Sequence, residues 1–178
     1  MPTQSESPRV YKVYPLRNVF IYNNIVYNPP GFRSEWNHFS IAGPQAPSAG
    51  TNIPSPASVD TNLRIRGNII FNGPPDLPLG VGEPDQGGQP SNPTCNATVL
   101  VAQNAINTMQ PQLADPAAGD FRPAAGGNVL GYQAQPIPDF TWADAPHPPT
   151  VPAGQLANGV ALDYAGAPRT TPTHPGAY

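Results

Sequence analysis

The clearest pattern in the chain is an eleven-residue segment of alternating apolar and polar positions that occurs twice. The first repeat segment, residues 18–28, reads NVFIYNNIVYN, and the second, residues 62–72, reads NLRIRGNIIFN. The two lie 44 residues apart and share asparagine at the first, seventh and eleventh places. Apolar residues alternate with other residues along each half of a segment, as in a β-strand that buries one face. We therefore predict two short strands in each segment.

A bend separates the two predicted strands of each segment. The bend residues are Asn23 and Asn24 in the first segment and Gly67 and Asn68 in the second. Asparagine and glycine adopt left-handed backbone angles at low cost. A strand–bend–strand unit with one apolar face cannot bury that face alone and needs an equivalent unit stacked on it. The repeat therefore predicts a solenoid, whereas the alternative is two unrelated apolar strands that happen to be similar.

The spacing of the repeat predicts the number of coils. Parallel β-helices commonly use roughly 20 to 25 residues per coil. A separation of 44 residues then predicts one further coil between the two segments, near residues 37–43. A weaker candidate for a third repeat segment is residues 99–107, with Gln103 and Asn104 as its bend.

Composition separates the last part of the chain from the rest. The 178 residues suit one domain, and they include 27 prolines and 17 glycines. Prolines crowd the C-terminal part, where they exclude long helices and central strands. We predict a flexible segment over residues 1–9, β-helix coils with loop insertions over 10–130, and a Pro-rich extended tail over 131–178. The tail would pack on the coils through apolar anchors such as Ile137 and Leu162.

Charge and cysteine content exclude several classes of function. The net charge is −3 and the few basic residues are scattered, which disfavours binding to nucleic acid. The sequence contains no apolar run long enough to span a membrane and no secretory signal in its first residues. Cys95 is the single cysteine, so neither an internal disulfide nor a cysteine metal cluster can form. We expect no cofactor and no metal site, because no acidic cluster offers calcium ligands.

The first group of candidate ligand-binding residues lies in one loop. Arg33, Glu35, Trp36 and His38 follow the sequence Pro-Pro-Gly and combine a cation, a carboxylate, an indole and an imidazole. An aromatic ring can stack on a sugar and its polar neighbours can bind hydroxyl groups. The alternative is that Trp36 packs the loop against the coil. Glu35 and His38 could do acid/base work, but one carboxylate is not the pair that a glycosidase ordinarily uses, so we assign no catalytic residue.

The second group is a pair of arginines in the second repeat segment. Arg64 and Arg66 alternate with Ile65 and would project from the outer face of a strand, about 6.5–7 Å apart. Such a pair suits the carboxylate of an acidic sugar. The alternative is that both side chains are solvated and keep the outer face soluble.

Several motifs together resemble those of right-handed parallel β-helix proteins of the pectate-lyase-like superfamily. They are the repeated IYNNI and IRGNI units, the segments 111–116 and 119–123, and the closing elements DYAGAPR and GAY. The resemblance implies an all-β fold: a short right-handed parallel β-helix of about three to four coils followed by the Pro-rich extended segment. It also implies an extracellular or cell-surface location and relatives that bind or cleave polysaccharides.

The chain departs from that family because a repeat segment lies almost at its start. An uncovered first coil would expose apolar side chains and strand edges. We therefore expect missing upstream coils or another protein subunit to cover the open end near residues 10–27. The function that fits best is a non-catalytic scaffold or interaction module, with a polysaccharide as one candidate ligand. The alternatives are the end fragment of a polysaccharide lyase or glycoside hydrolase, and an accessory subunit of a larger assembly.

Overall fold

The fold is β-rich with little helix in a computed structural model that describes residues 18–29, 31–32, 35–41, 62–74, 76–81, 92–138, 162–163, 166, 168 and 174–176. The sheets are small and mixed. The strands are β1 (Phe20–Tyr22), β2 (Ile25–Tyr27), β3 (Arg64–Arg66), β4 (Ile69–Phe71), β5 (Ala105–Ile106), β6 (Leu113–Asp115) and β7 (Asp120–Pro123). The helices are α1 (Ala97–Gln103) and the 3-10 turns η1 (Pro116–Ala118) and η2 (Asn128–Gly131).

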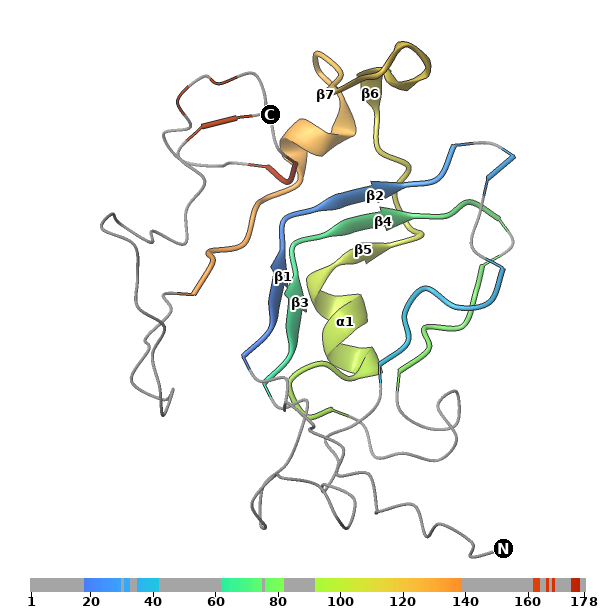
Figure 1. The fold of residues 1–178 in the computed structure, drawn as a ribbon, viewed down its shortest axis with the longest axis vertical. Helices are drawn as coiled ribbons and strands as arrows, with labels where there is room; N and C mark the ends of the chain where they lie inside the picture. The colour runs from blue at the N-terminus through green and yellow to red at the C-terminus, as the bar shows by residue number, and fades with distance from the viewer. Residues whose placement is uncertain are drawn as a thin grey trace, which may run out of the picture. The chain divides into compact units, whose positions relative to one another are not determined.

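The two repeat segments pair with each other in the register that the sequence predicts. β1 pairs with β3, and β2 pairs in parallel with β4, which pairs in parallel with β5 (Figure 1). Ile25 lies opposite Ile69, and Tyr27 lies opposite Phe71. A one-residue slip would turn every apolar side chain to the other face. The burial of Ile69, which is 0% exposed, therefore fixes this register.

Side-chain amides link the paired segments at each repeated asparagine. The amide of one asparagine donates to the amide oxygen of its counterpart 44 residues away, a contact that needs parallel strands in register. Asn68 extends its ladder to a third level, since its Nδ2 donates to Asn104 Oδ1 at 2.8 Å. The pairs are Asn62 to Asn18 at 2.7 Å, Asn24 to Asn68 at 2.9 Å and Asn28 to Asn72 at 2.5 Å.

The predicted bends are confirmed by the backbone angles. Asn23 has a φ of 56° and Gly67 a φ of 67°, both in the left-handed region. Packing also requires glycine at position 67, because a Cβ there would clash with the Oδ1 of Asn23 and would lie 2.9 Å from the Cγ of Gln135. Only glycine satisfies both conditions at this bend.

The third repeat segment is only half as predicted. Its second half forms β5, in which Ala105 lies opposite Ile69. Its first half is not a strand, because residues up to Gln103 form α1. Asn96 explains the difference: its Oδ1 accepts the backbone N–H of Val99 at 3.0 Å, which is a helix cap.

The expected extra coil between the two segments is wrong, because β2 pairs directly with β4. The segment at residues 38–41 instead pairs with residues 78–81, and Ile41 forms a parallel bridge with Val81. Backbone N–H groups of His38 and Phe39 donate to Pro78 and Leu79, each at 3.0 Å. The long connections belong to the repeat itself, so 44 residues hold one repeat rather than two.

The chain divides into two compact units, and each has its own core. In the first unit Ile41, Val81 and Cys95 are buried. In the second, Ile69, Ala105 and Val129 form a buried cluster. The first unit comprises Met1–Val19, Trp36–Arg64 and Leu77–Val99, and the second comprises Phe20–Glu35, Ile65–Asp76 and Leu100–Tyr178.

Parts of the C-terminal region contact the first repeat segment. Asn23 exchanges two hydrogen bonds of 2.8 Å with the backbone of Gln135. The two expected anchors within the described residues are exposed instead: Ile137 is 38% exposed and Leu162 is 50% exposed. The described part of the tail is held by the Gln135 backbone bonds and by Tyr132, which packs against the buried cluster of the second unit. No helix among the described residues is long and apolar enough to cross a membrane.

Candidate functional site

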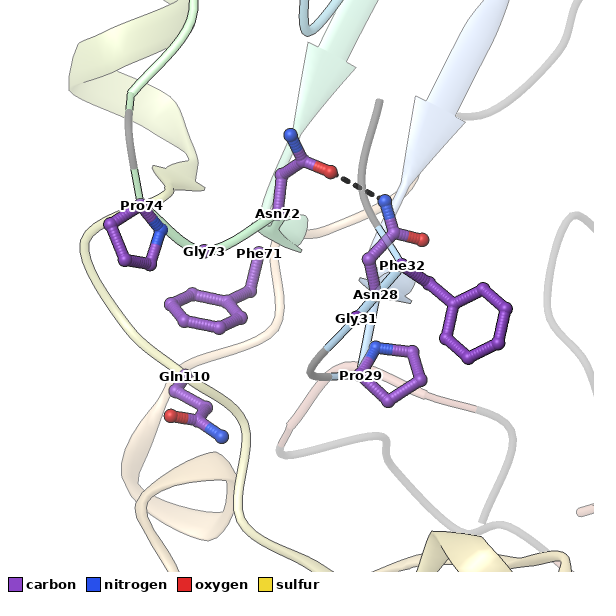
Figure 2. Close-up of a pocket in the computed structure, with 9 residues that line it drawn as sticks. All are labelled: Asn28, Pro29, Gly31, Phe32, Phe71, Asn72, Gly73, Pro74 and Gln110. Atoms are coloured by element: carbon purple, nitrogen blue, oxygen red, sulfur yellow. Dashed lines mark hydrogen bonds between the residues drawn. The ribbon is translucent and has the colours of Figure 1, made fainter. Parts of the chain in front are cut away.

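A pocket of about 350 Å³ lies in the second unit, where β2 and β4 end and their chains turn away (Figure 2). The two strands end at equivalent positions of the two repeat segments, and each is followed by asparagine and then by proline or glycine, which end strand pairing. The parallel register therefore places both exit turns side by side. The lining residues are Asn28, Pro29, Gly31, Phe32, Phe71, Asn72, Gly73, Pro74 and Gln110.

Hydrogen bonds hold the asparagine side chains of the pocket in place. Asn28 donates its Nδ2 to Asn72 Oδ1, and its own Oδ1 points away from Asn72 (Figure 2). Asn107 accepts the backbone N–H of Asn72 at 3.0 Å and donates to Asp76 Oδ1 at 3.0 Å. The amide orientation of Asn28 is thus fixed by its partner, and its Oδ1 is left outside that hydrogen bond.

Two phenyl rings of different character flank these amides. Phe71 is held in place, because its ring stacks on that of Tyr27 at 6.2 Å between centroids. Phe32 is 71% exposed and is the more accessible ring. In Figure 2 the two rings lie on opposite sides of the view, with Pro29 between them. The pocket thus combines a fixed ring and an exposed ring with amide groups.

None of the described residues that line the pocket carries an ionisable side chain. Asparagine and glutamine amides both donate and accept hydrogen bonds, which matches the hydroxyl group. Aromatic and proline rings offer apolar surface beside them. The arrangement can therefore bind an uncharged ligand that carries both hydroxyl groups and apolar faces, and the described lining residues offer no acid or base for proton transfer.

None of the described members of the predicted loop site lines this pocket. Arg33 lies outside the described residues. Glu35 is exposed and belongs to the second unit, whereas Trp36 and His38 belong to the first. Trp36 is 79% exposed, so the expectation that it packs the loop is wrong. Its role as a ligand contact stays a prediction.

The two predicted arginines lie on β3 and differ in their partners. Arg64 donates its Nε to Asn62 Oδ1 at 2.9 Å. Arg66 has a buried Nε without a hydrogen-bond partner among the described residues. Ligand binding by either residue stays a prediction.

Arg66 is one of three residues in a column across β1, β3 and the last residue of α1 that have unsatisfied polar atoms. The bonds Asn23 N to Arg66 O and Gly67 N to Gln103 O place Tyr22, Arg66 and Gln103 opposite one another. Tyr22 Oη, Arg66 Nε and Gln103 Oε1 are all buried without a hydrogen-bond partner in the described part of the chain. The column offers two donors and one acceptor, which one buried water could join.

Titratable groups with shifted pKa values lie outside the pocket lining. The Arg122 side chain lowers the pKa of Asp120 to about 2 through a hydrogen bond on the exposed β6–β7 hairpin. Burial raises the pKa of the Tyr132 hydroxyl, which packs against the core of the second unit. Among the described residues, no group of three or more His, Cys, Asp or Glu comes together to hold a metal.

Sequence reasoning missed this pocket although it found the strands that build it. Phe32 and Gln110 are far apart in sequence, and neither carries a charge. The signal available was the recurrence of asparagine followed by a proline-rich turn after both repeat segments. Comparisons with protein-family models, with curated proteins and with solved structures each give no match to this chain.

Proposed function

We propose that this chain is a non-catalytic binding module that holds a neutral sugar in the pocket at the ends of β2 and β4. The observation that carries the proposal is the described lining, whose side chains are amides, aromatic rings and proline rings with no ionisable group among them. A carboxylate or phosphate ligand would find no cation among the described lining residues. An uncharged sugar could place its hydroxyl groups against the amide side chains and its apolar faces against the aromatic and proline rings.

The framework that we propose for this pocket is a short right-handed parallel β-helix. Parallel pairing of β2, β4 and β5 supports it, and so does the asparagine ladder through Asn24, Asn68 and Asn104. The order of pairing along the chain supports it too: β1, β2 and residues 38–41 are followed by β3, β4 and residues 78–81. We take the hand to be right, because parallel crossover connections almost always are.

Binding would use the exposed ring and the oriented amides together. The Phe32 ring would cover the apolar face of a sugar ring, which loses contact with water on burial. Asn28 Oδ1 would accept a hydroxyl hydrogen, and the Gln110 amide would exchange further hydrogen bonds. Because Asn72 already fixes the Asn28 amide, this side chain loses little conformational entropy when the ligand binds.

The pocket chemistry favours binding over turnover. Glycosidases ordinarily place a pair of carboxylates about the bond they cleave, and lyases need a base for proton abstraction. The lining supplies neither. The polysaccharide-lyase and hydrolase alternative would therefore need residues that lie outside this pocket.

A glycan array followed by titration calorimetry tests the proposal. We expect the protein to bind neutral glycans in preference to uronic-acid or sulfated ones. Phe32→Ala removes the exposed ring and should weaken binding at least about tenfold, since a buried phenyl ring contributes roughly 1.5–3 kcal/mol. Phe121→Ala is the matched control, because Phe121 is 51% exposed on β7 and does not line the pocket.

The control separates loss of a ligand contact from a general effect of losing an exposed phenylalanine. Phe121→Ala should bind as tightly as the unaltered chain, and circular dichroism should show both variants folded. The proposal would be refuted if the protein bound only acidic glycans, or if the Phe32→Ala variant and the unaltered chain bound neutral glycans with equal affinity.

A further inference from the structure

A triplet of the form Asn-x-Thr lies at the start of α1 and does not line the pocket (Figure 1). It consists of Asn96, Ala97 and Thr98. An asparagine two residues before serine or threonine, with any residue except proline between them, is the acceptor pattern for N-linked glycosylation. Such a triplet also arises by chance, so its meaning depends on whether the two reacting side chains are accessible in the folded chain.

Both side chains that the modification requires are accessible. Asn96 is partly buried, and its Oδ1 accepts the backbone N–H of Val99 at 3.0 Å. Its Nδ2 makes no hydrogen bond within the part of the chain that the structure describes, and it is not one of the buried atoms that lack a partner. Thr98 is exposed, and its hydroxyl has no hydrogen-bond partner among the described residues.

A second triplet, four residues earlier, has the opposite arrangement. Asn92, Pro93 and Thr94 have the same spacing, but proline occupies the middle position. Asn92 is 2% exposed, and its Oδ1 accepts the backbone N–H of Thr94 at 3.1 Å. The Thr94 hydroxyl hydrogen is shared between Asn92 Oδ1 at 2.9 Å and Leu63 O at 2.7 Å. This triplet is closed by internal hydrogen bonds, whereas the triplet at Asn96 is open.

We propose that Asn96 is an N-glycosylation site, which takes an oligosaccharide from a lipid-linked diphosphate donor. The Nδ2 atom forms a bond to C1 of the first sugar and gives up one proton. The bond from C1 to the diphosphate oxygen breaks, and its electron pair leaves with the lipid diphosphate. The Oδ1 atom does not react, so it keeps its hydrogen bond with Val99 N and α1 keeps its cap.

A glycan at this position would supply polarity that α1 lacks. The helix contains no charged residue, and its exposed positions include Ala97, Val101 and Ala102. Val101 is 59% exposed. Exposed apolar side chains without neighbouring charge favour association with other molecules, and an N-linked oligosaccharide is bulky and solubilising. The glycan would therefore keep this face of the protein in solution, and this role does not depend on the sugar-binding pocket.

Secretion of the full chain from cultured eukaryotic cells, with a cleavable signal peptide added, tests the site. We expect the mass to exceed that of the polypeptide by one oligosaccharide, which N-glycosidase removes. Thr98→Ala should abolish the addition and Thr98→Ser should retain it. Thr108→Ala is the matched control, because Thr108 is also exposed but does not lie two residues after an asparagine. A secreted chain without oligosaccharide, or an oligosaccharide that persists in Thr98→Ala, would overturn the proposal.

Urea unfolding tests whether the folded chain carries the glycan with its cap intact. The glycosylated chain should unfold at a urea concentration no lower than that of the same chain made without glycan in bacterial cells. Asn96→Ala removes the cap oxygen and should unfold at a lower concentration than either. A glycosylated chain that unfolds together with Asn96→Ala would show that the sugar breaks the cap, and would overturn the proposal that the fold accommodates it.

Discussion

Asn68 is the residue on which the stacking of the repeat segments should depend most. Its side chain makes five hydrogen bonds: Oδ1 accepts from the N and Nδ2 of Asn24, and the two hydrogens of Nδ2 are shared among Ile21 O, Arg66 O and Asn104 Oδ1. The residue is 1% exposed, so water does not replace these partners. Asn68→Ala removes all five bonds and leaves the backbone conformation available.

The loss of unfolding free energy in Asn68→Ala depends on which hydrogen bonds the former partners of the Asn68 side chain retain. A buried hydrogen bond contributes about 0.5–1.5 kcal/mol net. Arg66 O retains a donor in Asn23 N at 3.1 Å, and Asn104 Oδ1 retains the N–H of residue 68 at 3.0 Å. We therefore discount the sum of about 5 kcal/mol to about 3 kcal/mol. That is a large share of a typical domain stability of about 5–15 kcal/mol.

Urea unfolding followed by circular dichroism measures this cost, with Asn24→Ala as the comparison. Asn24 occupies the same ladder at the exposed end, where water can replace its partners, so its loss should cost about 1 kcal/mol or less. We expect Asn68→Ala to lower the free energy of unfolding far more than Asn24→Ala does. Equal effects of the two substitutions would refute the reasoning that burial of the ladder makes it stabilising.

Two further predictions concern a close backbone contact and a surface ion pair. Gly80→Ala should lower the unfolding free energy by at least about 2 kcal/mol, because φ is 71° and a Cβ would strike the carbonyl oxygen of Phe39. Gly119→Ala, with a φ of 83° and open space, should cost less, and the reverse order would contradict the packing argument. Asp120 should titrate near 2 by carbon NMR, and Arg122→Gln should return its pKa toward 3.8. Because the pKa of Asp120 is lowered in the folded protein, the Asp120–Arg122 pair stabilises the hairpin at pH values above 3.8, and this stabilisation is lost as the pH falls through about 2. An Asp120 titration midpoint that Arg122→Gln leaves unchanged would refute this cause.

The strand register could be predicted from the sequence because asparagine and aliphatic positions repeat at one spacing. Asn24 and Asn68 align in sequence and in the ladder alike. The number of coils cannot be predicted from the spacing alone, because long connections within one repeat carry no periodic signal and are indistinguishable in length from an additional coil. The strand expected before Gln103 failed because the Asn96 cap favours a helix that the alternation of apolar residues does not reveal.

The pocket could not be predicted in the same way. Its rings and amides come from turns after two strands and from Gln110, which tertiary pairing alone brings together. The sequence instead drew attention to charged residues and to Trp36, and none of the described ones lines the pocket. A neutral site leaves little trace in sequence, since asparagine, proline and phenylalanine also serve turns and cores.

The most direct test is an NMR titration of the isotope-labelled protein with a neutral oligosaccharide identified on the array. The account predicts saturable shifts of the side-chain amides of Asn28 and Gln110 and of the Phe32 ring, with little change at Phe121. Saturable shifts elsewhere on the protein, with the pocket signals unmoved, would contradict it.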